Sequence, residues 1–214
     1  MGVAGLRRMS KTFVFICLLL VGNVVFADTV FYLHGRIVED EGPRPVHERF
    51  GLYDYPAIVE ALGTDGATVE AEVRESGTKA HEYAQTVVER IEDMIATGTA
   101  PEDITVVGFS KGGSIAIFTS YFLGHPDVNF VFIAACADWI SSAPQLTVSG
   151  NILSIYEESD ALAGSCASLA SRNDNLSSFT ELAISTGKEH GAFYLPRDDW
   201  VEPLLGWIEG GEGD

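Results

Sequence analysis

The stretch Ile104-Thr-Val-Val-Gly-Phe-Ser-Lys-Gly-Gly-Ser-Ile-Ala-Ile-Phe118 is the most informative part of this sequence. Its first half, Ile104–Gly108, is apolar and β-branched, which predicts a buried strand, and its second half has the composition of a buried helix. The chain must therefore turn from strand to helix within about three residues. A turn this tight places its central residue, Ser110, in a strained conformation with an exposed side chain.

The surroundings of Ser110 suit a catalytic nucleophile. Gly108 and Gly112 avoid a Cβ where it would crowd the neighbouring backbone. The helix that begins after Ser110 supplies oriented N–H groups and the positive end of a dipole. The pentapeptide Gly108-Phe-Ser-Lys-Gly112 is a weak signal by itself, and a buried serine at a helix terminus is the alternative. The strand before it and the helix after it favour the nucleophile.

Further strands and helices alternate on both sides of this turn. Apolar β-rich segments predict strands at Thr29–Leu33, Thr68–Val73, Asn129–Ala135, Asn151–Tyr156 and Phe179–Ser185. Helical patterns cover Tyr55–Leu62, Lys79–Ala96, Lys111–Leu123, Ala161–Ser171 and Asp198–Glu209. Such alternation predicts the α/β class: a mostly parallel sheet of about six strands with helices on both faces. Catalytic residues in such sheets gather at the carboxyl ends of the strands.

The N-terminal residues differ from the rest. Arg7, Arg8 and Lys11 precede an apolar run from Thr12 to Phe26, which predicts a signal peptide over residues 1–27 with cleavage after Ala27. A membrane anchor is the alternative, but the run is short for crossing a bilayer. We therefore expect a periplasmic or secreted protein whose single domain spans residues 28–214.

The charge balance excludes some partners. The 214 residues carry 13 Lys and Arg against 31 Asp and Glu, a net charge of −18. Without the three cations of the predicted signal peptide, 10 remain against 31, a net charge of −21. Such a charge repels nucleic acid and anionic lipid, so we expect neither nucleic acid nor, for the mature form, a membrane as partner.

The segment Phe31-Tyr-Leu-His-Gly35 predicts the second half of an oxyanion hole. In hydrolases with such a turn, one N–H belongs to the residue after the nucleophile and another to the loop after this strand. Here these are the backbone amides of Lys111 and Arg36. His34 precedes the nucleophile in the chain, and we expect it to brace the loop rather than act as a base.

The base and the acid follow the nucleophile in the chain. His190 lies after the last predicted strand, where a loop can bring it to Ser110, whereas His81 and His125 lie in polar contexts. Asp160, after the penultimate predicted strand, is the preferred acid. Alternatives are Glu157, Glu158 and Asp138. The order Ser110, Asp160, His190 fits a Ser–His–Asp triad.

Two cysteines remain after the predicted cleavage, Cys136 and Cys166. In an oxidising compartment such a pair predicts a disulfide, and two buried free thiols are the alternative. A bridge would close a loop that includes Asp160. We hypothesise that it holds that loop in place.

The segment 36–55 is predicted to be a long loop that walls the site, with Arg49, Phe50 and Tyr53 as candidate substrate-binding residues. Arg36, Arg49 and Lys111 could together hold an anionic group, unless nearby acidic residues neutralise them: Glu39, Asp40, Glu41 and Glu48. Only about 15 residues separate the strands that end near Ala135 and begin near Asn151, which is the length of an ordinary connection and predicts no lid.

These segments resemble those of small α/β-hydrolases, in particular the dienelactone-hydrolase and carboxylesterase–thioesterase branch. The resemblance rests on Leu33-His-Gly35, Gly108-Phe-Ser-Lys-Gly112, Ser159-Asp160 and Glu189-His-Gly191, and it extends from Phe31 to Ile208. It implies Ser110, Asp160 and His190 as the triad, with the amides of Arg36 and Lys111 as the oxyanion hole. The sheet lacks the family's first two strands, and Lys111 stands where related esterases often carry an uncharged residue.

The predicted function is hydrolysis of small soluble acyl esters or thioesters through an acyl-enzyme, with no cofactor. The histidines lack metal-ligand spacing, so no metal site is predicted. The alternative from another class is a non-catalytic binding protein with the same fold.

Overall fold

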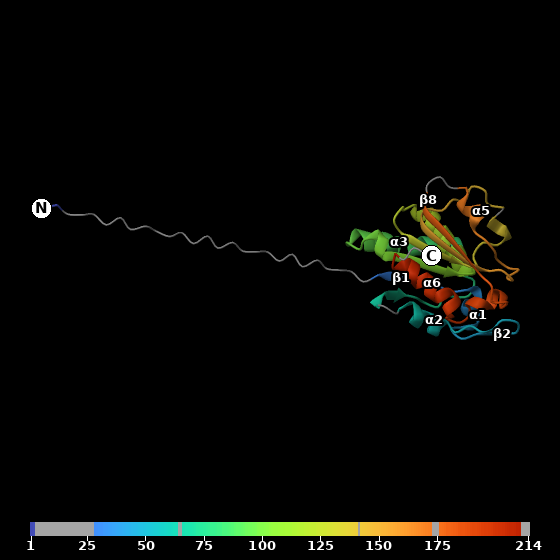
Figure 1. Cartoon of the computed structure of the whole chain (residues 1–214). Coiled ribbons are helices and arrows are strands. Elements are labelled where there is room, and N and C mark those ends of the chain that lie inside the picture. Colours follow the sequence, from blue (N-terminus) through green and yellow to red (C-terminus); the bar gives the residue numbers. More distant parts are fainter. Residues whose placement is uncertain (3–27, 64–65, 141, 173–175, 211–214) are drawn as a thin grey trace.

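A computed structural model of the chain describes residues 1–2, 28–63, 66–140, 142–172 and 176–210 (Figure 1). The predicted signal peptide falls almost entirely on residues 3–27, outside these ranges. Among the described helices, none combines the length and the apolar character needed to cross a membrane.

A single six-stranded sheet forms the centre of the domain. Its strands are β1 (Thr29–Leu33), β4 (Thr68–Glu70), β5 (Ile104–Phe109), β6 (Asn129–Ile133), β7 (Gly150–Glu157) and β8 (Leu176–Ile184). They pair in the order β4-β1-β5-β6-β7-β8, and every pairing is parallel. The predicted parallel sheet is therefore confirmed, and β5, which leads to Ser110, lies inside it between β1 and β6.

Helices connect the strands. α2 (Tyr55–Leu62), α3 (Ala80–Ala96), α4 (Lys111–Leu123) and α6 (Asp198–Ile208) begin and end within one residue of the predicted positions. Short 3-10 helices occupy Pro101–Asp103, Asp138–Ile140 and Glu189–Phe193. The helix predicted at 161–171 is wrong in extent, because α5 covers only Ala167–Ala170. The preceding residues are held instead by bonds to distant segments, as described below.

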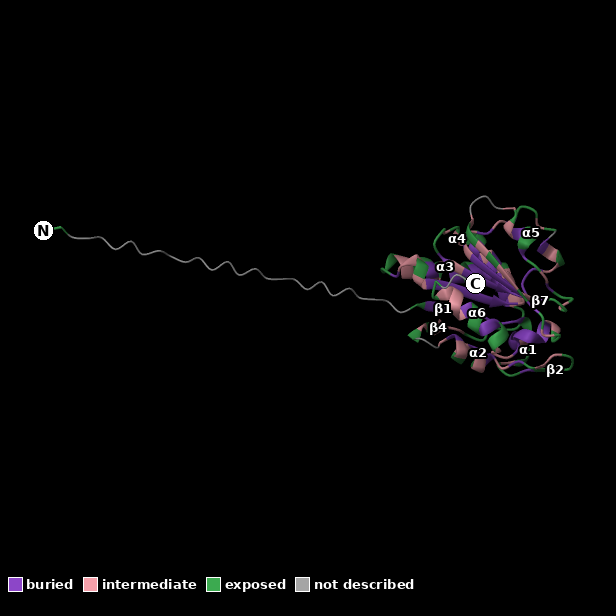
Figure 2. Cartoon of the chain, viewed as in Figure 1, coloured by how far each residue is buried: buried purple, intermediate pink, exposed green. Residues whose placement is uncertain are grey.

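Alternate residues of the strands point to opposite faces of the sheet and pack into two separate hydrophobic cores. From β1, Val30 and Tyr32 pack with residues of α2 and α6, whereas Phe31 and Leu33 pack with residues of α3 and α4. The central strands are buried along their length, and exposed residues gather on the outer sides of the helices (Figure 2). This two-sided cover explains why β5 is apolar at every position rather than alternating.

The segment between β1 and α2 is more ordered than the predicted long loop. It contains a helix, α1 (Arg36–Glu41), and a two-stranded ribbon formed by β2 (Val46–His47) and β3 (Gly51–Leu52). Each element is too short to produce a recognisable hydrophobic period, so the sequence pattern could not predict it.

The connection between β6 and β7 forms no separate domain over the site. Its described residues include one 3-10 helix, Asp138–Ile140, and the side chain of Ile140 packs into the core. This agrees with the expectation of an open site.

Candidate active site

Ser110 occupies a strained turn between β5 and α4. Its φ of 56° and ψ of −114° fall outside the conformations that non-glycine residues normally adopt. The adjoining glycines are required sterically. A Cβ on Gly108 would lie 2.3 Å from the carbonyl oxygen of Gly112, and one on Gly112 would lie 1.8 Å from that of Leu33. The turn therefore has the strained, close-packed geometry expected of a nucleophile elbow.

Strained backbone conformations occur at Ser110 and at residues close to it or to His190. In the described part of the chain three non-glycine residues have a positive φ: Ser110, Ala134 and Glu189. Ala134 follows β6 and lines a cavity beside Ser110, and Glu189 immediately precedes His190. Strained residues persist where surrounding structure over-determines them, and they are frequent at active sites.

His190 and Asp160 form a buried pair. His190 Nδ1 lies 2.6 Å from Asp160 Oδ2, and the exposed fractions of the two side chains are 8% and 1%. The amide of Leu162 donates to the other oxygen, Oδ1, at 2.8 Å. Because a carboxylate only accepts, Nδ1 carries the proton of this bond. Nε2 is then left as the acceptor of the ring.

Ser110 and His190 line the same two cavities. No direct hydrogen bond joins them among the described residues. Such bonds are often long in the free state of hydrolases and tighten with substrate. The ring of Phe109 packs against His190 with centroids 4.8 Å apart, and Phe50 packs at 6.1 Å. These contacts restrict the rotation of the imidazole.

Glu157, an alternative acid in the sequence, has a different position. It is buried at the end of β7, and its carboxylate accepts hydrogen bonds from the amides of Ser159, Thr186 and Gly187 at 2.7–2.9 Å. Burial by itself raises the pKa of Glu157, but these hydrogen bonds lower it below its usual value. Glu157 thus joins the segment that leads to Asp160 to the segment that leads to His190.

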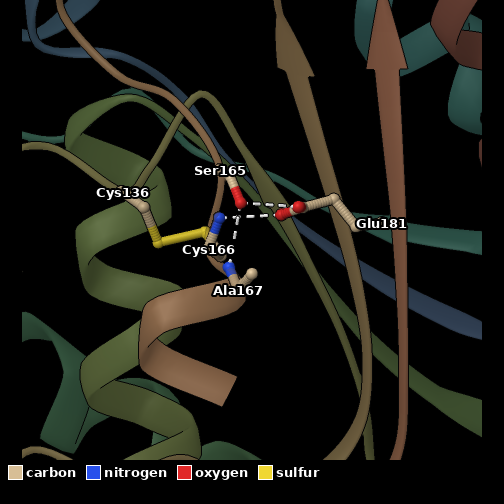
Figure 3. The surroundings of a disulfide bond; sticks show 5 residues. All are labelled: Cys136, Ser165, Cys166, Ala167 and Glu181. Carbon is tan, nitrogen blue, oxygen red and sulfur yellow. Dashed lines mark hydrogen bonds between the residues drawn. A yellow bond between two sulfur atoms is a disulfide. The ribbon is translucent and has the colours of Figure 1, made fainter. Parts of the chain in front are cut away.

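The far end of the Asp160 loop is held by a disulfide and a second carboxylate (Figure 3). Cys136 and Cys166 are bridged, and Cys136 O accepts from the amide of Gly164 at 3.0 Å. Glu181, on β8, accepts from the amide of Cys166 at 2.7 Å and from the hydroxyl of Ser165 at 2.6 Å. The loop between β7 and α5 is therefore fixed at both ends. A disulfide is compatible with an extracellular protein.

The two amides predicted for the oxyanion hole lie at helix starts. Lys111 is the first residue of α4 and Arg36 the first residue of α1. Neither N–H has an acceptor inside its own helix, since the first amides of a helix lack an intrahelical partner. Both residues line cavities that Ser110 also lines.

A buried carboxylate connects these two helix starts. Glu39 of α1 accepts from Arg74 Nε at 2.9 Å through one oxygen, and its other oxygen contacts Lys111 Nζ. The side chains of Glu39 and Arg74 are 0% and 1% exposed. Lys111 therefore pairs with a buried acid that fixes α1 beside α4.

His34 braces the loop before α1. It is fully buried, its Nε2 accepts from the amide of Arg74 at 3.0 Å, and its Nδ1 lies 2.8 Å from the carbonyl of Gly35. Burial and, to a smaller extent, the charge of Arg74 lower the pKa of His34 to about 4. His34 is therefore neutral at pH 7, and both of its ring nitrogens bond to the Gly35 and Arg74 segments.

Two cavities meet at Ser110. The larger, of about 370 Å³, is walled by the segment 36–55 through Arg36, Ile37 and Phe50, and it also contacts Tyr194. The smaller, of about 150 Å³, is lined by Trp139 and by four alanines: Ala134, Ala135, Ala137 and Ala163. Leu162, next to the acid and 57% exposed, borders both.

The candidate substrate-binding residues have different positions. Phe50 lines the larger cavity. Tyr53 does not, and its prediction is wrong: the side chain is fully buried beneath the site, where its hydroxyl bonds to Tyr32 and accepts from the amide of Gly35. Arg49 lies outside that cavity and pairs with Glu189 at 2.6 Å.

The predicted anionic-group site made of Arg36, Arg49 and Lys111 is likewise not assembled. Arg36 pairs with Asp40 at 3.5 Å, Lys111 with Glu39, and Arg49 with Glu189. The alternative, neutralisation by nearby acidic residues, therefore holds for Arg36 and Lys111, whose partners Asp40 and Glu39 are two of those residues. Within the described ranges, no cluster of three or more metal-ligating side chains occurs.

The sequence does not reveal the supporting roles of Glu39, Arg74, Glu157 and Glu181, although Glu39 and Glu157 were candidates for other roles, as a neutralising acid and as an alternative catalytic acid. Each acts through a partner that is distant in the chain, and Arg74 lies 35 residues from Glu39. A lone charged residue is typical of a solvated surface, so only the fold identifies Glu39, Arg74 and Glu157 as buried.

Comparisons with known proteins agree with this architecture. No family model matches the sequence, and no curated protein matches it. A variant of SOBER1 from Arabidopsis thaliana has a TM-score of 0.57 at 14% identity, with 87% of this chain and 99% of that chain covered. Esterase PE8 has a TM-score of 0.55 at 16% identity, covering 86% and 93%. A lipase-esterase related protein from Clostridium acetobutylicum has a TM-score of 0.51 at 11% identity, covering 86% and 94%.

These identities are too low to transfer an activity, but the coverage is nearly complete. Together with the parallel sheet and the strained turn after β5, the likeness establishes the architecture. The chain has the α/β-hydrolase fold.

Proposed function

We propose that the protein is a secreted serine hydrolase that cleaves small acyl esters or thioesters. The observation that carries the proposal is the buried Asp160–His190 pair, which shares two cavities with a serine held in a strained strand-to-helix turn. That combination supplies a nucleophile, a base and a group that orients the base. The predicted signal peptide and the Cys136–Cys166 disulfide support secretion.

In the proposed reaction Ser110 Oγ attacks the carbonyl carbon of the ester while His190 Nε2 takes the hydroxyl proton. The carboxylate of Asp160 holds the imidazole in the required tautomer and stabilises the imidazolium. The tetrahedral oxyanion accepts hydrogen bonds from the amides of Arg36 and Lys111. Each such donor typically contributes on the order of 10²-fold to the rate.

The intermediate collapses when His190 gives its proton to the departing alcohol or thiol, which leaves an acyl group on Ser110. Water then attacks the acyl-enzyme, and His190 takes the water proton and returns it to Ser110 Oγ. The products are a carboxylic acid and an alcohol or thiol. The balance requires water as the only co-reactant.

The alanine-lined cavity supports a short acyl group. At about 150 Å³ it has the size of a cavity that holds a benzene-sized molecule. The larger cavity, open and walled by Phe50 and Tyr194, suits the leaving group.

The test is hydrolysis of p-nitrophenyl acetate, butyrate and octanoate by the wild type, by Ser110→Ala and by Ser171→Ala. We expect activity on the short esters, unaffected by a metal chelator, and loss of at least about 10³-fold in Ser110→Ala. Ser171 is exposed and lines neither cavity at Ser110, so Ser171→Ala is the control for removing a hydroxyl and should match the wild type. Equal activity of wild type and Ser110→Ala overturns the proposal, and no activity in either favours a non-catalytic binding protein.

A further inference from the structure

A third cavity is lined by residues on both sides of His190 in the chain. This cavity, of about 280 Å³, is lined by Arg49, Phe50, Lys188, Glu189, Gly191 and Arg197 among others, and we call it the basic pocket. Phe50 also lines the larger cavity at Ser110, so the two cavities share a wall. Neither Ser110 nor His190 lines the basic pocket.

The cations of this pocket are unusual for the molecule. The described ranges contain ten of the 13 Lys and Arg residues, since the other three lie at positions 7, 8 and 11. Seven of the ten make ion pairs: Arg36, Arg44, Arg49, Arg74, Lys79, Arg90 and Lys111. Arg172 donates to the carbonyls of Ile140 and Ala143. The two that remain, Lys188 and Arg197, both line the basic pocket.

An unsatisfied donor accompanies this charge. Arg197 Nε is buried and has no hydrogen-bond partner. A buried N–H of a charged group without an acceptor is costly, so the protein itself leaves the guanidinium of Arg197 short of acceptors. In a chain with 31 acidic residues, these two cations line one cavity, and neither forms an ion pair in the described part of the chain.

The charge of the lining indicates which anion fits. Three cations and the carboxylate of Glu189 give a net charge of about +2, since Arg49 stays paired with Glu189. A phosphate monoester carries a charge near −2 at pH 7 and offers three acceptor oxygens. The planar fork of Arg197 and the point charge of Lys188 both suit phosphate oxygens.

We propose that the basic pocket is a binding site for a phosphate monoester group, with Lys188 and Arg197 as its principal ligands. The shared wall at Phe50 places this group beside the cavity of Ser110. A ligand that carries the phosphate can therefore extend past Phe50 toward the nucleophile. This last step rests on the proposed hydrolase function, whereas the phosphate site itself does not.

The site is tested first by binding, which requires no hydrolysis. Isothermal titration of the wild-type protein with inorganic phosphate and with phenyl phosphate at low salt should show one site, weakened by added NaCl. We expect Lys188→Gln and Arg197→Gln each to weaken it roughly tenfold or more, as for one lost charge-assisted hydrogen bond. Arg197→Lys, which keeps the charge but not the fork, should fall between.

The control is Lys79→Gln, which removes one positive charge from an exposed side chain paired with Glu82, away from the pocket lining. It should bind phosphate like the wild type. Lys188 is exposed, so its variant should fold normally. Absence of phosphate binding, or equal binding in all variants, overturns the proposal.

A kinetic arm identifies the source of the phosphate. The wild type is assayed on the acetyl ester of 2-hydroxyethyl phosphate and on ethyl acetate, and each kcat/KM is compared with that of Arg197→Gln. A preference for the phosphorylated ester that Arg197→Gln abolishes assigns the phosphate to the substrate. Phosphate binding without such a preference assigns a free phosphate ligand. If neither ester is cleaved but phosphate binds through Lys188 and Arg197, the hydrolase proposal fails and the phosphate site stands.

Discussion

The two sides of the candidate site are built in opposite ways. On one side, the turn that presents Ser110 depends on glycines, which have no Cβ. Gly108 and Gly112 let three backbone segments approach within contact distance. On the other side, the loops that carry Asp160 and His190 depend on added bonds from Glu157, Glu181 and the Cys136–Cys166 disulfide. The first arrangement is local in sequence, and the second joins segments 15 to 30 residues apart.

The difference teaches where each side is vulnerable. A close backbone contact cannot adjust, so a single added methyl group should disrupt the nucleophile turn completely. A loop held by several independent bonds should lose stability stepwise as each bond is removed. The two sides can therefore be separated by substitutions of known severity.

The largest effect is expected for Gly112→Ala. Its Cβ would lie 1.8 Å from the carbonyl oxygen of Leu33 and 2.8 Å from that of His34, so β1 and α4 must separate. We expect a loss of about 4 kcal/mol or more in the free energy of unfolding, or no folded protein. The control is Gly206→Ala in α6, where an added Cβ meets nothing within 4 Å. That variant should be as stable as the wild type or up to about 1 kcal/mol more stable in urea unfolding.

This contrast also explains what the sequence could predict. The strand, the tight turn and the helix around Ser110 form one continuous pattern of residue types, so periodicity and two glycines were sufficient. The chain order placed an acid between Ser110 and His190 and favoured Asp160. Residue type alone does not distinguish Asp160 from the other candidate carboxylates, Glu158 and Asp138. Tyr53 was predicted to line the site because the sequence pattern of its segment indicated a loop. An aromatic residue in a predicted loop suggests a site wall, yet Tyr53 packs against Phe109 and Tyr194 and is fully buried.

The second largest effect should come from the disulfide. Replacing Cys136 and Cys166 by serine opens a loop of separation 30, and we expect a loss of about 3 kcal/mol. The wild type in reductant should unfold at the same urea concentration as the double variant. Reaction of Cys136 or Cys166 with a maleimide in unfolded, unreduced protein would contradict the bridge.

Glu157→Gln should cost less, about 1–3 kcal/mol, because the amide of glutamine retains one acceptor oxygen for donors that now use two. We expect kcat on p-nitrophenyl acetate to fall with little change in KM, since the bonds connect the segments before Asp160 and His190. Glu158→Gln, one residue further and exposed, is the matched control and should leave both quantities unchanged.

The most gradual effect is a pH dependence that separates the two sides. The pKa of His34 is about 4 in the folded protein and about 6.5 when unfolded, so the unfolded chain binds one more proton between these values. Stability should therefore fall as the pH drops from 6.5 to 4, by at most about 1.4 kcal/mol per pH unit from this group. The lowered pKa of Glu157 has its effect only below its usual value, at lower pH.

Urea unfolding from pH 7 to pH 4 measures this slope. His34→Gln removes the titrating group, so its slope should be shallower by up to one proton. His81→Gln, whose wild-type side chain is 56% exposed, should keep the wild-type slope. If the free energy of unfolding depends on pH with the same slope in all three proteins, groups other than His34 cause the acid sensitivity.

Covalent labelling with a fluorophosphonate tests the central claim most directly, because the reagent phosphonylates a serine only where a base activates it. Intact-mass analysis of the wild type should show one adduct, and peptide mapping should place it on Ser110. Ser110→Ala should show none, and His190→Ala or Asp160→Ala should label far more slowly, while Ser171→Ala, at an exposed serine outside both cavities, should label like the wild type. An unlabelled wild type, or an adduct that persists in Ser110→Ala, would contradict the assignment of Ser110, Asp160 and His190 as a catalytic unit.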